Sequence, residues 1–181
     1  MSADESHFNR LTLKRPYTWS IHSKCASRCE FSLSRQKYSL LPALSLDDIL
    51  HLEVVENAVT DDDFLWFVQG LLAKMNKWPL PNSVLVIDNT SVDNVAGVRE
   101  AVEEHGARLL CLPSYSPNFN PIELAFSTIK AWLWRDCERM NESLQSENGV
   151  VYDNFWEAVQ SITVGDAKGW YRQCGYTLGV E

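Results

Sequence analysis

Three acidic residues stand in settings that suit metal-dependent chemistry. Asp88 ends an apolar run that begins at Val84, and Glu123 follows the proline-containing segment 113–121. Thirty-four residues lie between these two acids, and Asp4 stands near the start of the sequence. Carboxylates that converge from distant segments are what a pair of magnesium ions needs for phosphodiester chemistry. The sequence therefore indicates a candidate site formed by Asp4, Asp88 and Glu123.

Each acid also has a purely structural interpretation. The Asp88–Asn89 pair suits the start of a turn, and an acid near a terminus, such as Asp4, commonly has no role. The segment Asn120–Glu123 fits a capping box, in which the glutamate reaches back to the asparagine amide. Capping does not explain Pro113 and Pro117, which stiffen the approach to the helix. Both interpretations of each acid stay open at the level of the residues.

Elements that could position these acids follow from the hydrophobic periodicity. Strands alternate with helices, and this order predicts an α/β fold in which a mixed sheet is covered by helices on both faces. We expect the strand at 107–112 to be buried, like the strand at 83–87. The predicted strands are 4–9, 17–21, 37–45, 49–56, 83–87 and 107–112. One predicted helix opens at Thr60, and the others cover about 95–105, 121–140, 155–162 and 170–176.

Length and composition predict one domain. The chain has 181 residues, which we divide into a core of about 4–140 and a C-terminal helical extension of about 150–178. Five cysteines form no complete zinc-binding pattern, so we expect reduced thiols. No apolar run is long enough to cross a bilayer and the first residues lack a signal pattern, so we expect an intracellular protein with no membrane partner.

Charge is unevenly distributed along the chain. The net charge of −8 argues against a protein that simply coats DNA. The segment Arg10–Lys37 nevertheless carries seven basic residues and one acid, with Tyr17, Trp19 and Phe31 between them. Such a segment could lie along a phosphate backbone, or it could be a solvated strand and loop whose aromatic rings turn inward.

Three sequence blocks together resemble the catalytic domain of mariner-superfamily DDE transposases. They are Asp4-Glu5-Ser6, Val86-Ile87-Asp88-Asn89, and the longer block from Leu112-Pro113-Ser114-Tyr115-Ser116-Pro117 to Asn120-Pro121-Ile122-Glu123. The resemblance runs from Asp4 to about Arg135, and the spacing between the second and third acids also agrees with that family.

The resemblance implies an RNase H-like fold in which Asp4, Asp88 and Glu123 hold two Mg²⁺ or Mn²⁺ ions. It implies cleavage and transfer of DNA strands, with transposon ends and target DNA as partners. A nuclear location and a homodimer are further expectations from the same resemblance.

Departures from the family pattern support a second hypothesis. Asp93 stands where the family usually has a histidine, the first strand lacks the apolar half expected before Asp4, and no helix-turn-helix segment precedes the domain. The sequence therefore leaves two alternatives: a metal-dependent transposase or endonuclease, or an inactive, shortened transposase-derived module that binds DNA or protein.

Overall fold

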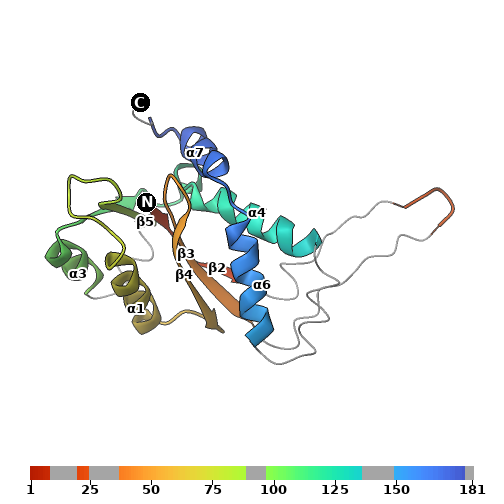
Figure 1. Ribbon diagram of the computed structural model, residues 1–181, viewed down its shortest axis with the longest axis horizontal. Helices are drawn as coiled ribbons and strands as arrows, with labels where there is room; N and C mark the ends of the chain where they lie inside the picture. Colours follow the sequence, from red (N-terminus) through yellow and green to blue (C-terminus); the bar gives the residue numbers. More distant parts are fainter. Residues whose placement is uncertain (9–19, 25–36, 89–96, 136–148, 178–181) are drawn as a thin grey trace.

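The computed structural model describes residues 1–8, 20–24, 37–88, 97–135 and 149–177 (Figure 1). Within these ranges six strands form one mixed sheet and five α-helices pack against it. The strands are β1 (Ser2–Ala3), β2 (Ser6–Phe8), β3 (Tyr38–Leu44), β4 (Ile49–Glu56), β5 (Val84–Asp88) and β6 (Arg108–Leu112).

The order of strands across the sheet follows from their pairings. Both β1 and β2 pair with β3 in antiparallel fashion, so the first eight residues run along β3 as one interrupted strand. On its far side β3 pairs with β4, also antiparallel. On the other side of the sheet β1 pairs with β5 and β5 with β6, both in parallel. The sheet therefore reads β4, β3, β1 with β2, β5 and β6.

Helices cover both faces of this sheet, as Figure 1 shows. On one face lie α1 (Asp61–Leu72) and α3 (Val98–His105), and on the other lie α4 (Ile122–Arg135), α6 (Gly149–Gln160) and α7 (Val164–Gln173). A short 3₁₀ helix, η1 (Pro117–Phe119), precedes α4. The predicted α/β fold with a mixed sheet flanked by helices is confirmed.

Local sequence explains where the helices begin and end. Thr60 caps α1 in a capping box with Asp63, which satisfies amides that have no partner within the helix. Thr163 and Asp166 cap α7 in the same way. Gly106 ends α3 at a positive φ of 86°, which glycine adopts without the steric cost that other residues meet.

Two apolar clusters hold the layers together, one on each face of the sheet. The strand β3 serves both, because its side chains alternate: Leu40 and Leu44 face α4 and α6, whereas Leu41 and Ala43 face α1. All seven residues of β3 are buried, which makes it the central strand of the packing.

Two predicted strands differ from those observed. The strand expected at 4–9 is interrupted, because Asp4 and Glu5 lie between β1 and β2. The strand β6 is not buried as expected: Leu110 is 51% exposed. The reason is that β6 lies at the edge of the sheet, where an apolar run is not covered on both sides.

Parts of other predicted elements lie outside the described residues. These are 17–19 of the strand expected at 17–21, Val95 of the helix expected near 95, and 136–140 of the helix expected at 121–140. Ser20 and Ile21, the described part of the strand expected at 17–21, do not belong to a strand, so that part of the prediction is wrong. In the parts of the chain that the structure describes, none of the helices combines the length and apolar character needed to cross a bilayer.

Candidate functional site

Strand register brings Asp4 and Asp88 to the same level of the sheet. Ser2 is the partner of Val86 in the parallel pair of β1 and β5. Asp4, just beyond the end of β1, and Asp88, the last residue of β5, each stand two residues past this pair, and the alternation of side chains directs both to the face that α4 covers. Neighbouring strands lie about 4.8 Å apart, so the two acids belong to one small region at the carboxyl ends of the parallel strands.

The loop after β6 leads to Glu123, the third acid, at the start of α4 on the same face of the sheet. Because β6 is parallel to β5, with Asp88 opposite Leu112, the chain leaves β6 beside Asp88. It then passes through η1 and enters α4, in whose first turn Glu123 stands with an exposed side chain. An acid in a first turn is also favoured by the helix dipole, whatever its function.

Hydrogen bonds of Asn120 connect the beginning of α4 with Ser2 of β1 and with Asp4. This asparagine is 3% exposed, and its Nδ2 donates a hydrogen bond to Asp4 Oδ2 at 2.9 Å. Its Oδ1 accepts hydrogen bonds from the Ser2 hydroxyl and from the Ile122 amide, the latter at 3.4 Å. One side chain thus joins segments that are more than a hundred residues apart in sequence.

The capping-box interpretation of Glu123 is not realised. The Asn120 amide donates instead to the Pro117 carbonyl oxygen at 2.9 Å, which closes the turn of η1. The Glu123 amide donates to the Asn120 carbonyl oxygen at 3.2 Å. The Glu123 carboxylate is therefore not needed to start the helix.

The pKa of Asp4 shows that the charges of the other two acids act on its carboxyl group. The pKa of Asp4 is raised from 3.8 to about 6, with burial as the largest cause, and the Glu5 amide, which donates to Asp4 Oδ1 at 2.8 Å, opposes that rise. The charges of Glu123, Asp88 and Glu5, in that order, contribute the rest of the increase. Among the described residues, the side-chain charges that shift the pKa of Asp4 are thus all negative, and such surroundings favour a positive charge.

The chemical types of these side chains suit a metal ion, but their spacing in this structure does not form a ready-made metal site. Carboxylate oxygens are the ligands that Mg²⁺ and Mn²⁺ prefer, and the buried, negatively surrounded Asp4 would gain from a cation. Within the described ranges, however, no three His, Cys, Asp or Glu side chains form a cluster that could hold an ion. Mutual repulsion is expected to keep bare carboxylates apart.

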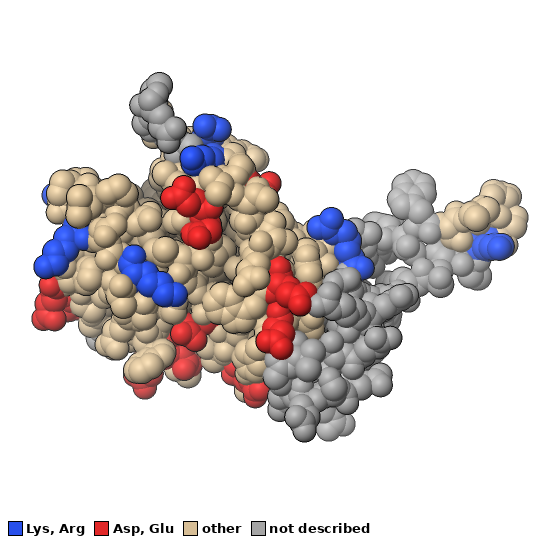
Figure 2. Space-filling model, in the orientation of Figure 1, with Lys and Arg blue, Asp and Glu red and all other residues tan. Residues whose placement is uncertain are grey.

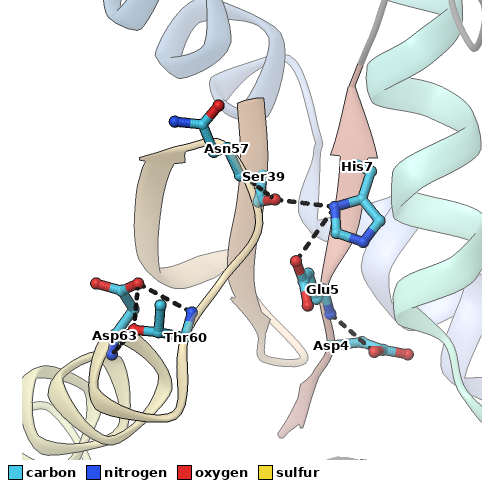
Figure 3. A network of polar contacts seen from close by, with 7 residues as sticks. All are labelled: Asp4, Glu5, His7, Ser39, Asn57, Thr60 and Asp63. Carbon is cyan, nitrogen blue, oxygen red and sulfur yellow. Dashed lines mark hydrogen bonds and ion pairs between the residues drawn. The ribbon is translucent and has the colours of Figure 1, made fainter. Parts of the chain in front are cut away.

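A second polar network lies close by, around Glu5 and His7 (Figure 3). The Ser39 hydroxyl donates to the Asn57 carbonyl oxygen at 2.7 Å and lies 2.9 Å from His7 Nδ1, so it must accept the hydrogen that Nδ1 carries. His7 Nδ1 also lies 3.2 Å from Glu5 Oε1. This network is connected to Asp4 through Glu5, whose amide donates to Asp4 Oδ1.

Several sequence-based predictions fall outside the described residues. Most of the basic segment Arg10–Lys37 does so, and so does Asp93. On the face seen in Figure 2, lysine and arginine side chains are scattered among aspartates and glutamates.

Sequence reasoning missed the role of Asn120 and the network at His7. An asparagine before a helix predicts a cap, and nothing in the local sequence signals its bond to Asp4. The alternation of strand residues places Glu5 and His7 on one face, but only the pairing of β2 with β3 brings Ser39 beside them.

Comparison with known protein families gives one match to a large part of the chain. A family model described as DDE superfamily endonuclease matches residues 1–145. No curated protein sequence matches the chain.

Comparison with solved structures gives matches over almost the whole chain. One is the Mos1 mariner paired end complex with Mn, at 13% identity and a TM-score of 0.65, which covers 96% of this chain and 51% of that one. Another is a pre-cleavage Mos1 transpososome, at 13% identity and a TM-score of 0.57, covering 98% and 56%. The Mos1 transposase catalytic domain with raltegravir and Mg matches at 12% identity and a TM-score of 0.51, covering 98% and 84%.

These structural matches establish the fold. The chain spans about half the length of the first of these solved chains and most of the isolated catalytic domain. The likeness therefore lies in the catalytic part of those proteins, in agreement with the mixed sheet and flanking helices described above.

Proposed function

The chain belongs to the DDE superfamily endonuclease family, and on that premise we propose that it is a mariner-type transposase catalytic domain, which cleaves DNA strands and transfers them. The observation that carries the proposal is the placement of three acids. Asp4 directly follows β1, Asp88 ends the parallel strand β5 beside it, and the charge of Glu123 acts on Asp4 from the start of α4. The structural likeness to Mos1 transposase supports the same function.

Asp4, Asp88 and Glu123 would hold two divalent ions, Mg²⁺ or Mn²⁺. When bound, such ions activate a water or a DNA 3′-hydroxyl and stabilise the leaving oxygen of an in-line displacement. The solved Mos1 structures with Mn and with Mg support this choice of ions.

The chain's own residues would orient the first acid. The Glu5 amide donates to one oxygen of Asp4 and Asn120 Nδ2 to the other, which fixes the plane of the carboxylate. Each oxygen keeps a further lone pair for a cation. Burial of Asp4 limits the water that competes for these lone pairs, and the N-terminus of α4 favours anionic groups, including phosphate, beside Glu123.

We further propose DNA as the partner, both as transposon ends and as target. The solved relatives include a paired-end complex and a transpososome, which supports this proposal and also supports a homodimer. A nuclear location follows from the same proposed substrate.

A catalytically inactive module is the second candidate. Two observations favour it: the interruption of the first strand at Asp4, and the spacing of the acidic side chains, which form no ready cluster within the described residues. Such a protein would keep the fold and bind DNA or protein, but it would not organise divalent ions.

Magnesium-dependent nicking of DNA separates these candidates. We expect the purified chain to nick a DNA duplex with Mg²⁺ or Mn²⁺ and not with EDTA. Asp88→Asn and Glu123→Gln should each lower the nicking rate at least about 100-fold, because even partners of metal ligands contribute about 10–100-fold. Asp62→Asn is the matched control, since Asp62 is an exposed acid on α1, on the other face of the sheet.

Equal rates for the unaltered chain, the two site variants and the control would reject the proposed chemistry. Manganese titration by calorimetry gives an independent measure, because an inactive module would release no binding heat that depends on Asp88 or Glu123.

A further inference from the structure

The sheet holds the chain less firmly at Asp4 and Glu5 than on either side of them. These two residues lie between β1 and β2 and belong to neither strand. The register against β3 is the same before and after this break, so Pro42 stands opposite Asp4. Proline has no amide hydrogen to donate to the ladder at that place. The position of Asp4 therefore depends on side-chain contacts more than the positions of its neighbours do.

A row of contacts leads from the end of β4 to Asp4, as Figure 3 shows. The Ser39 hydroxyl donates to the Asn57 carbonyl oxygen and accepts the hydrogen of His7 Nδ1. His7 Nδ1 in turn lies 3.2 Å from Glu5 Oε1. The last contact is the hydrogen bond from the Glu5 amide to Asp4 Oδ1, at 2.8 Å. The row thus ends on an oxygen of the proposed metal ligand.

Each member of this row depends on the one before it. Ser39 is fully buried and stands directly opposite His7 in the pair of β2 and β3, where facing side chains contact each other. Glu5 Oε1 is buried too, and within the described part of the chain it accepts no hydrogen bond. A carboxylate oxygen in such a place is costly unless a favourable group lies beside it, and His7 Nδ1 is that group. Ser39 therefore fixes His7, and His7 fixes Glu5.

We propose that His7 and Ser39 are positioning residues for Asp4. Through Glu5 they hold the break between β1 and β2, so that the Glu5 amide stays on one oxygen of Asp4 while Asn120 holds the other. Fixed in this way, the carboxylate directs its remaining lone pairs toward one place, which is what binding of a divalent cation requires. The inference rests on the proposed function, in which Asp4 is a metal ligand.

Hydrogen exchange of the Glu5 amide tests the positioning without any metal. Exchange is followed by NMR on the isotope-labelled chain in EDTA. We expect Ser39→Ala and His7→Leu each to speed exchange of this amide at least about 10-fold, because it loses the protection of its bond to a charged acceptor. The Val86 amide, which donates to the Met1 carbonyl oxygen at 2.8 Å, is the internal reference and should exchange at an unchanged rate.

Manganese titration by calorimetry tests the consequence for the cation. His7→Leu and Ser39→Ala should each weaken binding of Mn²⁺ about 10-fold, at the lower end of the effect of partners of metal ligands. Neither variant removes a carboxylate, so the loss reports orientation and not charge. His7→Asn should restore the affinity to within about 3-fold, because the asparagine amide nitrogen is as many bonds from Cβ as Nδ1 is and can donate in its place.

Ser83→Ala is the matched control. Ser83 is also a buried serine that donates to a backbone carbonyl oxygen, that of Leu80, but it stands just before the start of β5, whereas Asp88 ends that strand. It should change neither the exchange of the Glu5 amide nor the affinity for Mn²⁺. The His7 side chain is 61% exposed, so His7→Leu leaves the apolar packing intact and decides the question if Ser39→Ala fails to fold.

Several results would overturn the positioning role. They are an unchanged exchange rate at Glu5 or an unchanged affinity for Mn²⁺ in both variants, an equal acceleration at Val86, a loss with Ser83→Ala as large as with Ser39→Ala, and binding of Mn²⁺ by His7→Asn as weak as by His7→Leu. Absence of Mn²⁺ binding by the unaltered chain would reject the proposed function instead, and the exchange rates in EDTA would still decide the role of His7 and Ser39.

Discussion

At the scale of the residue, Asp4 stands out because it is buried among charges of its own sign. Burial raises its pKa to about 6, and Glu123 and Asp88 push in the same direction. A shift from 3.8 to about 6 corresponds to about 3 kcal/mol between the two protonation states. The carboxylate form of Asp4 is thus unfavourable for the fold at neutral pH in the absence of cations.

The pH dependence of stability follows from that shift. Because the folded-state pKa of Asp4 is above its unfolded value, the folded chain binds the extra proton. The resulting stabilisation is fully present below about pH 3.8 and is lost as pH rises through about 6. In EDTA, we expect Asp4→Asn to increase the free energy of unfolding at pH 8 by about 1–3 kcal/mol and to leave it nearly unchanged at pH 4.

Urea unfolding at the two pH values measures this difference. A benefit from Asp4→Asn of equal size at pH 4 and pH 8 would contradict the electrostatic explanation. Addition of Mg²⁺ at pH 8 should stabilise the unaltered chain more than the variant, because only the carboxylate attracts the cation.

At the scale of the element, one buried asparagine connects the start of α4 with the interrupted first strand. Asn120 bonds to Ser2 of β1 and to Asp4, so it fastens the loop after β6 to this strand. The bond from Tyr176 to Phe119 fixes the same loop from the segment after α7. The edge strand β6 also helps to position this loop. Because β6 runs parallel to β5, the chain leaves β6 beside Asp88.

Removal of the Asn120 side chain should weaken both elements together. We expect Asn120→Ala to lower the free energy of unfolding by about 1–3 kcal/mol, because buried polar groups on Ser2 and Asp4 lose their partner. It should also lower the affinity for Mn²⁺, since Asp4 loses the donor that fixes its orientation. Urea unfolding and manganese titration give the two values.

Asn154 provides the matched control for this variant. It is also buried, at 2% exposed, yet its Nδ2 has no hydrogen-bond partner among the residues that the structure describes. Asn154→Ala should therefore cost less stability than Asn120→Ala and leave manganese affinity unchanged. Similar losses for the two variants would show that burial alone, and not the link to Asp4, determines the effect.

At the scale of the whole molecule, the apolar packing continues beyond the part that the family model matches. That match ends at residue 145, whereas α6 and α7 supply buried side chains to the cluster that α4 and β3 share. Phe155 of α6 packs against Phe8 and Tyr38, with ring centroids 5.4 Å and 5.8 Å apart. We propose that the whole chain is one domain whose C-terminal helices are integral to its stability.

Two adjacent aromatic residues of α6 test this proposal. Phe155 is fully buried, so we expect Phe155→Ala to lower the free energy of unfolding by about 3–5 kcal/mol in one cooperative transition. Trp156 is 42% exposed, and Trp156→Ala should cost about 1 kcal/mol or less. If α6 were an appendage, thermal unfolding followed by circular dichroism would give the same midpoint for Phe155→Ala as for the unaltered chain.

The sequence by itself determined the local features of this protein. Apolar periodicity identified β3, β4, β5 and α1, because side-chain spacing along one element decides which face it buries. Thr60 and Gly106 identified helix ends, since caps depend only on neighbouring residues. The acids and the proline-containing block sufficed to suggest the family, because these motifs are short and local.

Tertiary structure alone decided what depends on contacts between distant segments. The exposure of β6, the bond from Asn120 to Asp4 and the raised pKa of Asp4 each arise where one strand or helix meets another. No spacing along the chain encodes which strand lies at an edge or which charges face a buried carboxylate. The shared level of Asp4 and Asp88 likewise follows from the parallel register of β1 and β5, because strand pairing is set by the packing of the whole sheet.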